Sequence, residues 1–337
     1  MSKIAVLGTG SWGTVLANLL VENGHDVQLW GRNQDIVQEI NREHTNRHYL
    51  PHFHLHSHLK AQTDIGQALA AVELVLFVVP TNAIRNVANQ AKPHLKKMTV
   101  KPLLVHAAKG IELSTKLRIS QVLDQLLPVK EFGEVVVISG PSHAEEVAKK
   151  EITMLTAASK NLKSAEKVQR LLGNDYFRLY TNSDVVGVEI GGALKNIIAL
   201  GAGIANGLGY GDNAKAALMT RGLAEISRFG SKLGANPLTF SGLSGLGDLI
   251  VTCTSNDSRN WRAGNQLGKG KSLDQVLAQM GQIVEGVYTD QAVHFAAKDL
   301  NVSMPIVDAL YEILYENNNI KTGIKKLMNR DLKPEFQ

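Results

Sequence analysis

Three glycines, Gly8, Gly10 and Gly13, stand at the spacing G-x-G-x-x-G between a short apolar run and a helical pattern. In a strand–turn–helix context the first glycine permits a tight turn and the second lets the backbone approach a pyrophosphate. The third lets the helix pack closely on the sheet. The free amide groups at the helix N-terminus favour phosphate there. The alternative is a structural turn without a ligand, but this context favours dinucleotide binding.

The residues at the end of the second predicted strand indicate which dinucleotide binds. NAD-specific proteins usually have an acidic residue here, which bonds the ribose 2′-hydroxyl. This chain has Trp30-Gly31-Arg32-Asn33, without an acid. Arg32 can pair with a 2′-phosphate, although a solvated surface arginine is the alternative. We therefore expect NADP(H) as the cofactor, with NAD(H) tolerated.

Lys195 is the most suggestive single residue for proton transfer. It lies in Gly191-Gly-Ala-Leu-Lys195-Asn196, a stretch apolar enough to be buried. Burial of an unpaired ammonium lowers its pKa toward the range useful for acid–base chemistry. The alternative is a lysine whose head reaches the surface. Asp248, in a second glycine-rich stretch, is a candidate partner for the lysine, and Asn196 could orient a ligand hydroxyl.

Further polar residues follow predicted strands or stand in a polar loop. Lys109 and the pair Gly140 and Ser142 come directly after two buried strands, at the carboxyl edge where ligands collect in such sheets. Ser142 could instead cap the next helix. Arg259, in the polar loop 255–260, offers a planar fork for a phosphate, although such a loop is often simply solvated.

The elements that would position these residues change character along the chain. Short apolar runs predict strands at 4–7, 27–30, 74–79, 103–106, 135–139, 152–157 and 177–180, with helices such as 12–22, 114–126 and 162–172 between them. This alternation predicts an α/β domain of the Rossmann type, with a doubly wound, mostly parallel sheet. Beyond it, the segments 184–206, 213–233, 272–280 and 289–300 have only helical patterns. We expect two domains, 1–189 and an all-helical domain 190–337.

Composition narrows the class of protein. The 337 residues carry 36 Lys and Arg against 31 Asp and Glu, a net charge of +5, and a single cysteine. The basic residues are dispersed, which argues against nucleic-acid binding, and one cysteine excludes an internal disulfide framework. No targeting segment or membrane span is evident, and the long apolar stretch 185–208 is interrupted by charged residues. We expect a cytoplasmic protein without integral membrane contact.

A histidine-rich segment is the one compositional oddity. Six of the eleven histidines fall between His44 and His58. A metal site is conceivable there, but no carboxylate or cysteine joins the cluster, so a solvated loop is the better interpretation. We expect no metal cofactor.

Six motifs, taken together and in order, carry a family resemblance. They are Gly-Thr-Gly-Ser-Trp-Gly-Thr, Ala-Lys-Gly, Ser-Gly-Pro-Ser-His-Ala, Gly-Gly-Ala-Leu-Lys-Asn, Gly-Leu-Gly-Asp-Leu and Ser-Arg-Asn. In this order the chain closely resembles the bacterial NAD(P)-dependent glycerol-3-phosphate dehydrogenases. The resemblance implies reduction of dihydroxyacetone phosphate to sn-glycerol 3-phosphate, a reversible reaction that supplies phospholipid synthesis, with Lys195 as proton donor and acceptor.

The resemblance also implies binding roles for individual residues. Besides the three glycines, the cofactor positions that it implies are Ser11, Trp12, Arg32, Tyr49, Lys109, Ala144, Arg259, Ile283 and Glu285. The substrate positions that it implies are Lys109, Gly140, Ser142, Lys195, Asp248, Ser258, Arg259 and Asn260. Lys109, Lys195 and Arg259 outnumber Asp248 in charge, which suits a phosphorylated substrate.

Two other classes remain alternatives at this stage. A 3-hydroxyacid dehydrogenase would share the two-domain architecture and the lysine, but the Ser-Arg-Asn loop favours a phosphorylated substrate. A non-catalytic NADP-binding sensor would have no need of a proton donor. The apolar helices could also form a homodimer.

Overall fold

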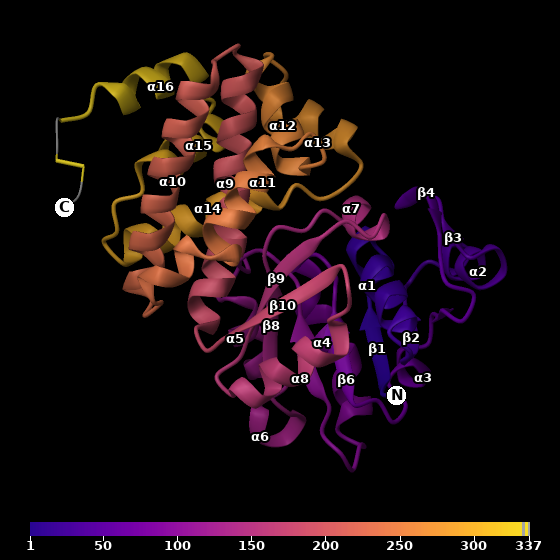
Figure 1. Ribbon diagram of the computed structural model, residues 1–337. Helices are drawn as coiled ribbons and strands as arrows, with labels where there is room; N and C mark the ends of the chain where they lie inside the picture. Colours follow the sequence, from indigo (N-terminus) through magenta and orange to yellow (C-terminus); the bar gives the residue numbers. More distant parts are fainter. Residues whose placement is uncertain (332–333, 336–337) are drawn as a thin grey trace.

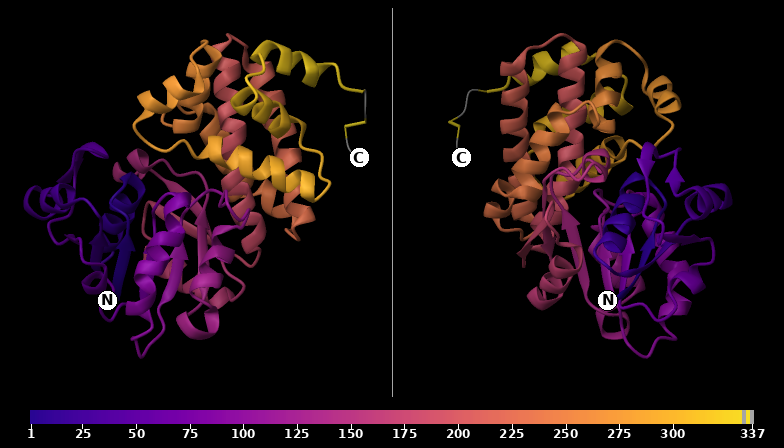
Figure 2. Two further views of the ribbon diagram at one scale, coloured as in Figure 1. Left: turned by 180° about the vertical axis from the view of Figure 1, so that it is seen from behind. Right: turned by 45° about the vertical axis from the view of Figure 1, so that its right-hand side comes forward.

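The computed structural model describes residues 1–331 and 334–335, which form a sheet-containing body and a body of helices (Figure 1). The helical body stands over one end of the sheet in every view (Figure 2). The strands are β1 (Lys3–Leu7), β2 (Asp26–Trp30), β3 (Thr45–Asn46), β4 (Leu50–His54), β5 (Lys60–Gln62), β6 (Leu74–Phe77), β7 (Leu103–His106), β8 (Val135–Ser139), β9 (Thr153–Ala158) and β10 (Phe177–Asn182).

Helices separate most of these strands and dominate the chain after β10. The first group is α1 (Ser11–Glu22), α2 (Gln34–Glu43), α3 (Ile65–Ala68), α4 (Ile84–Leu95), α5 (Ile119–Leu126), α6 (Val129–Phe132), α7 (Ala144–Ala148) and α8 (Leu162–Leu172). The second group is α9 (Val185–Gly207), α10 (Asp212–Lys232), α11 (Asp248–Thr254), α12 (Arg259–Gly268), α13 (Leu273–Met280), α14 (Glu285–Asp299), α15 (Pro305–Tyr315) and α16 (Ile320–Met328). Short turns of other helical types are η1 (Thr81–Ala83), η2 (Pro237–Ser241) and the π-helical η3 (Leu243–Gly247).

The eight-stranded sheet has the order β10-β9-β8-β7-β6-β1-β2-β5. Every neighbouring pair is parallel except β8 and β9, which run antiparallel. The chain leaves β1 toward β2 on one side and later returns to β6 on the other, so the order reverses between β1 and β6. In open α/β sheets this switch point marks the ligand crevice at the carboxyl ends of the strands. The predicted Rossmann-type, mostly parallel sheet is confirmed.

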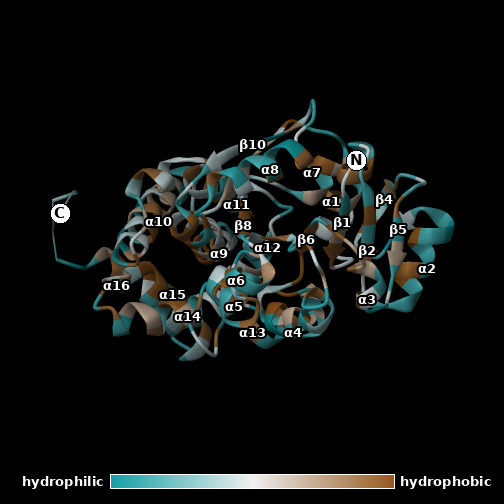
Figure 3. Cartoon of the chain, turned by 90° about the horizontal axis from the view of Figure 1, so that it is seen from below, coloured by the Kyte–Doolittle hydropathy of each residue, from teal (hydrophilic) through white to brown (hydrophobic). Residues whose placement is uncertain are grey.

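Apolar side chains from both faces of the sheet are buried under helices. Ile4 and Val6 face one cluster, and Ala5 and Leu7 face another, as expected for a parallel strand covered on both sides. Helices at the periphery keep a hydrophilic side, as α2 and α6 show in Figure 3, whereas α15 carries many hydrophobic residues. The two apolar clusters, one on each face of the sheet, fix the strand ends and therefore the loops that follow them.

One predicted helix begins later than expected. The pattern predicted a helix over 114–126, but α5 begins at Ile119. The preceding residues form a closed loop instead, in which the amide of Glu112 donates to the carbonyl of Leu117 at 3.0 Å and Lys116 has a left-handed φ of 60°. A bridge between Ile111 and Arg118 closes this loop. The contacts that close this loop therefore replace the first turn of the predicted helix.

The histidine-rich segment forms the β3–β4 hairpin and the turns beside it. His52 and His54 lie on β4 with exposed side chains. Within residues 1–331 and 334–335, no group of three or more His, Cys, Asp or Glu side chains is arranged to hold a metal ion.

The helical body is built around α9. This helix is long and apolar enough to cross a membrane, yet 89% of its most apolar window is buried inside the protein. Its glycines allow close approach: a Cβ on Gly191 would lie 2.5 Å from the carbonyl oxygen of Ser244, and one on Gly192 would lie 2.5 Å from Oγ of Ser139. The described chain contains no strand beyond β10. The predicted domain boundary at residue 189 falls within α9.

Candidate active site

The glycine turn has the shape that a dinucleotide phosphate needs. Gly8 has φ of 130°, and a Cβ on it would lie 2.3 Å from the carbonyl oxygen of Val78, while one on Gly13 would lie 1.9 Å from that of Gly8. A Cβ on Gly10 would meet nothing within 4 Å. Gly10 is the N-cap residue of α1, so no side chain caps the first amides of this helix. Open space thus lies before free helical amides, at the sheet's switch point, which fits a pyrophosphate.

The other predicted cofactor residues of the first domain lie near this turn. Ser11 and Trp12 form the first turn of α1, and Oγ of Ser11 donates to the carbonyl of Tyr49 at 3.0 Å. Arg32 is exposed directly after β2 and forms no ion pair within the described residues. No ion pair within the described residues therefore competes with a ligand for this guanidinium.

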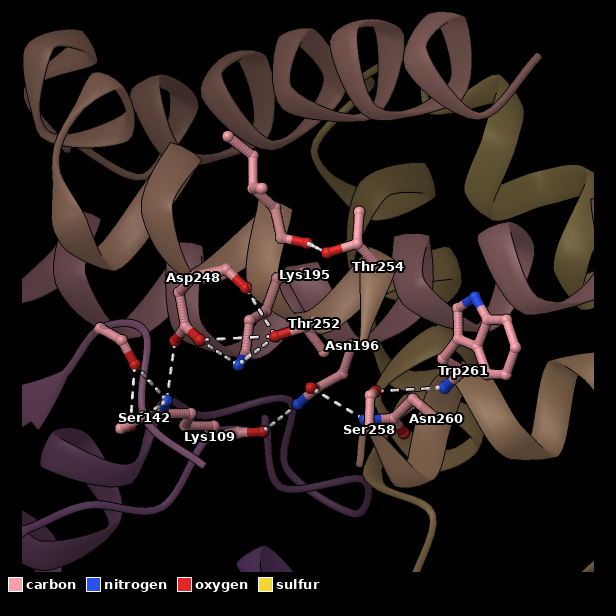
Figure 4. A network of polar contacts seen from close by, with 12 residues as sticks. Lys109, Ser142, Lys195, Asn196, Asp248, Thr252, Thr254, Ser258, Asn260 and Trp261 are labelled. Atoms are coloured by element: carbon pink, nitrogen blue, oxygen red, sulfur yellow. Dashed lines mark hydrogen bonds and ion pairs between the residues drawn. The ribbon is translucent and has the colours of Figure 1, made fainter. Parts of the chain in front are cut away.

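Two lysines and one aspartate form the charged centre of the site (Figure 4). Nζ of Lys109 lies 2.7 Å from Oδ2 of Asp248, and Nζ of Lys195 donates to Oδ1 of the same carboxylate. Lys109 comes from the loop after β7, Lys195 from α9 and Asp248 from the start of α11. The fold thus brings together residues 139 positions apart in the sequence. The predicted pairing of Asp248 with Lys195 is confirmed.

Lys195 is buried, so the alternative of a lysine that reaches the surface is wrong. Its side chain is 8% exposed, and that of Asp248 is 0% exposed. Burial lowers the pKa of Lys195 to about 7; the Asp248 charge opposes this shift and the Lys109 charge adds to it. An amine with this pKa is present in both protonation states near neutral pH.

Thr252 is a contact of Lys195 that the sequence patterns missed. Its Oγ1 accepts from Nζ of Lys195 at 2.7 Å and donates to the carbonyl of Asp248 at 2.5 Å. Thr252 lies one turn after Asp248 on α11, so the two side chains share a face. That i, i+4 spacing was the only available signal, and it becomes meaningful only once α11 is known to be helical.

The turn after β8 supplies a further side of the cluster. Nζ of Lys109 donates to the carbonyl of Gly140 at 2.9 Å and lies 3.5 Å from Oγ of Ser142. Ser142 donates to the carbonyl of Gly140 at 2.9 Å, and His143, not Ser142, is the N-cap of α7. The capping interpretation of Ser142 is therefore wrong, because its hydroxyl faces Lys109. Ala144 begins α7 and is buried.

A chain of side-chain amides links the segments around the site (Figure 4). Nδ2 of Asn196 donates to the carbonyl of Lys109 at 3.0 Å, and its Oδ1 accepts from Nδ2 of Asn260 at 2.9 Å. Oδ1 of Asn260 accepts from the amide of Gly286 at 2.8 Å. Asn196 thus holds the Lys109 loop and Asn260 through one N–H and its carbonyl oxygen, and its expected contact with a ligand hydroxyl stays a prediction. Ser258 caps α12 and is buried.

The remaining predicted residues line the region between the glycine turn and α12. Oε1 of Glu285 accepts from the amide of Thr81 at 3.0 Å, so the start of α14 contacts the loop after β6. Nη1 of Arg259 donates to Oε1 of Gln282 at 3.3 Å, and Arg259 is partly exposed. Ile283 is half-buried just before α14. The contact of Glu285 with Thr81 brings the start of α14 to the carboxyl edge of the sheet, and the ligand contacts of these three residues stay predictions.

Comparisons with known proteins agree with this arrangement. Residues 3–165 match the family model described as NAD-dependent glycerol-3-phosphate dehydrogenase N-terminus, and residues 184–325 match the one described as its C-terminus. The glycerol-3-phosphate dehydrogenase [NAD(P)+] of Lacticaseibacillus paracasei is 64% identical over 339 residues, covering 99% of this chain and 97% of that protein. The enzyme of the same name from Enterococcus faecalis is 59% identical over 333 residues, with 99% and 97% covered.

Solved structures give the same result. The crystal structure of glycerol-3-phosphate dehydrogenase from Coxiella burnetii has a TM-score of 0.92 at 38% identity, covering 98% of this chain and 99% of that one. A D-mandelate dehydrogenase also shares the fold, with a TM-score of 0.60 at 14% identity, covering 97% of this chain and 99% of that one. The fold alone thus does not separate substrate classes.

The glycine turn at the switch point and the buried lysine cluster define the class as a two-domain, dinucleotide-dependent oxidoreductase. Within that class, the chain belongs to the NAD-dependent glycerol-3-phosphate dehydrogenase family.

Proposed function

We propose that this protein reduces dihydroxyacetone phosphate to sn-glycerol 3-phosphate, reversibly, with NADPH or NADH. The observation that carries the proposal is the contact of Lys109 and Lys195 with one buried carboxylate, Asp248, at the carboxyl edge of the sheet. This cluster stands beside a turn shaped for a dinucleotide. It is positively charged overall, as an anionic substrate requires.

Lys195 is the proposed proton donor in reduction. Reduction of a ketone needs a proton on the oxygen as negative charge develops there, and an ammonium both stabilises that charge and donates the proton. With a pKa of about 7, Lys195 gives up its proton readily near neutrality. In the oxidative direction the neutral amine accepts the proton from the substrate hydroxyl.

Asp248 and Thr252 orient this amine. Both accept from Nζ of Lys195, so the ammonium has a fixed direction, and its remaining N–H can point at a substrate oxygen. Asp248 also holds Lys109. Its negative charge lies between the two amines and offsets part of their mutual repulsion.

The phosphate of the substrate is the proposed partner of the basic and polar residues around this centre. A phosphate monoester carries a charge of about −1.5 to −2 at neutral pH. Arg259 presents a planar fork from the start of α12, and Lys109 adds a second cation. Gly140, Ser142, Ser258 and Asn260 complete the proposed substrate residues.

A bound nicotinamide dinucleotide would supply the hydride. The proposed residues that hold it are the glycine turn, Ser11, Trp12 and Tyr49 near the pyrophosphate and Arg32 near the ribose. On the other side of the crevice they are Lys109, Ala144, Arg259, Ile283 and Glu285. The exposed guanidinium of Arg32 supports use of NADPH, and NADH would bind without that contact.

The wider assignments are also proposals. We propose domains 1–189 and 190–337, a cytoplasmic location without integral membrane contact, no nucleic-acid partner, and a possible homodimer formed through apolar helices.

The test compares dihydroxyacetone phosphate with unphosphorylated dihydroxyacetone and a short 3-oxoacid, with NADPH oxidation followed by absorbance. We expect rapid turnover of the phosphate ester only. Preferred turnover of the oxoacid would instead identify a hydroxyacid dehydrogenase. Tight NADPH binding without turnover of any of the three would indicate the non-catalytic sensor.

A further inference from the structure

The loop between β7 and α5 carries Lys109, and a single side chain of α9 holds both ends of this loop. The loop runs from residue 107 to residue 118. His106 precedes it at the end of β7, and Arg118 and Ser120 stand at its other end. Glu189, on α9, contacts all three of these residues.

The contacts of Glu189 are close and buried. Its Oε1 accepts from the amide of Ser120 at 2.7 Å and lies 3.2 Å from Nε2 of His106. Its Oε2 accepts from Oγ of Ser120 at 2.6 Å and from the guanidinium of Arg118. The side chains of Glu189 and His106 are 4% and 0% exposed. The directional hydrogen bonds therefore come from Ser120 and Arg118. At the other end of the loop His106 adds a close contact, since its Nε2 completes no hydrogen bond within the described residues.

The carboxylate is ionised at every physiological pH. Burial alone would raise the pKa of Glu189, but contacts with His106, Arg118 and Ser120 outweigh it and lower the pKa to about 2. The negative charge of Glu189 therefore persists through the physiological pH range.

We propose that Glu189 is a positioning residue, which clamps both ends of the Lys109 loop onto the helix that carries Lys195. Between the two clamped ends, Asn196 of the same helix holds the carbonyl of Lys109 at 3.0 Å. Residues 189, 196 and 195 of α9 thus fix the loop and present the amine. The inference relies on the proposed function only in taking Lys109 and Lys195 as the residues that face the substrate.

A second ion pair on the same loop provides a matched control. Glu112 lies within the loop, and its Oε2 is 2.7 Å from Nη2 of Arg85 on α4, with Glu112 largely buried. This pair connects the loop to α4 instead of α9. Glu189→Gln and Glu112→Gln therefore each remove one buried carboxylate charge, but only the first loosens the loop from the catalytic helix.

The first measurement is the pH dependence of dihydroxyacetone phosphate reduction by both variants. Since the charge of Lys109 contributes to the lowered pKa of Lys195, a loosened Lys109 lets that pKa rise. We expect Glu189→Gln to lower kcat/KM by about tenfold or more and to move the alkaline limb to higher pH. Glu112→Gln should lower only the stability of the protein and leave kcat/KM and the alkaline limb unchanged. If both variants lose stability equally and keep the wild-type limb and kcat/KM, Glu189 is merely structural and the proposal is wrong.

A second measurement separates this proposal from the proposed function. Acetylation of lysines by a small acylating reagent, quantified residue by residue with mass spectrometry, requires no turnover. We expect Lys109 to react several-fold faster in Glu189→Gln than in the wild type, with no change in Glu112→Gln. Unchanged Lys109 reactivity would overturn the clamp even if the enzyme reduces dihydroxyacetone phosphate. If the wild-type protein shows no turnover but Lys109 still reacts faster in Glu189→Gln than in the wild type, only the proposed function would be overturned.

If Glu189→Gln does not fold, Ser120→Ala serves in its place. It removes the hydroxyl contact at 2.6 Å but leaves the amide of Ser120 and the guanidinium of Arg118 bound. A smaller change in the same two measurements supports the clamp, and no change in either contradicts it.

Discussion

Replacement of Asp248 by asparagine should move the pH dependence of reduction to lower pH. Oδ2 of Asp248 lies 2.7 Å from Nζ of Lys109, and Oδ1 accepts from Lys195. Asparagine keeps the shape but removes the charge that holds up the pKa of Lys195. An opposite charge at such distances shifts a pKa by about 1–3 units. The pKa of Lys195, about 7 in the native protein, should fall by that amount.

The magnitude follows from the fraction of Lys195 that remains protonated. At neutral pH about half of Lys195 is protonated in the native protein. A drop of one to three units leaves roughly one part in ten to one part in a thousand, so reduction should slow by about 5-fold to about 500-fold. Part of this loss should be recovered at lower pH.

The assay is kcat/KM for reduction of dihydroxyacetone phosphate between about pH 5 and about pH 9. Asp184→Asn is the control, because Asp184 caps the start of the same helix, α9, without contacting either lysine. The control should keep the native alkaline limb. An unmoved limb in Asp248→Asn, or a limb moved to higher pH, would refute the electrostatic role of Asp248.

Three other substitutions test separate parts of the structure. Thr252→Val removes an acceptor at 2.7 Å from Lys195, so kcat/KM for reduction should fall by about 10-fold, with KM for NADPH unchanged. Arg32→Ala should raise KM for NADPH several-fold and leave KM for NADH almost unchanged, because only NADPH carries the 2′-phosphate; equal effects on both would contradict its role. Asp290→Asn should stabilise the protein. Burial raises the pKa of Asp290 well above its usual 3.8, so the folded state holds a proton that the unfolded state has lost. Stability therefore falls as pH rises above about 4, and the gain in Tm from this variant should be larger at about pH 8 than at about pH 5.

The sequence predicts those elements whose secondary structure follows from their own residues. β1 is a continuous apolar run that ends in glycines, and its position in a parallel sheet follows from those residues. The glycine turn and the apolar α9 are likewise visible locally. Buried Lys195 could be singled out because a charge within such a helix is unusual.

The parts that could not be predicted depend on contacts between distant segments. One exception is short-range: the late start of α5 results from the loop closed by Ile111 and Arg118, which the helical pattern of 114–126 does not indicate. Whether Ser142 caps a helix or faces Lys109 depends on where β7 and β8 place the two residues. The sequence could not show that Asn196 bonds the protein. Its partners Lys109 and Asn260 are 87 and 64 positions away. Thr252 and Glu189 were missed for the same reason.

The same limits apply to the substrate. A likeness in fold to D-mandelate dehydrogenase shows that the architecture serves several reactions, so the site and the family determine the assignment. The clustered charges of Lys109, Lys195 and Asp248 are specific to the site. The types of these residues indicated an anionic substrate. Their spacing in the sequence could not predict how they are arranged in space.

The most direct test of the account is NADPH oxidation with dihydroxyacetone phosphate by the native protein and by Lys195→Ala, with the Kd for NADPH measured for both. We expect the native protein to turn over and the variant to lose about 10²–10⁴-fold in kcat while it binds NADPH as tightly. Native-like kcat in Lys195→Ala would contradict the central claim that this buried amine transfers the proton.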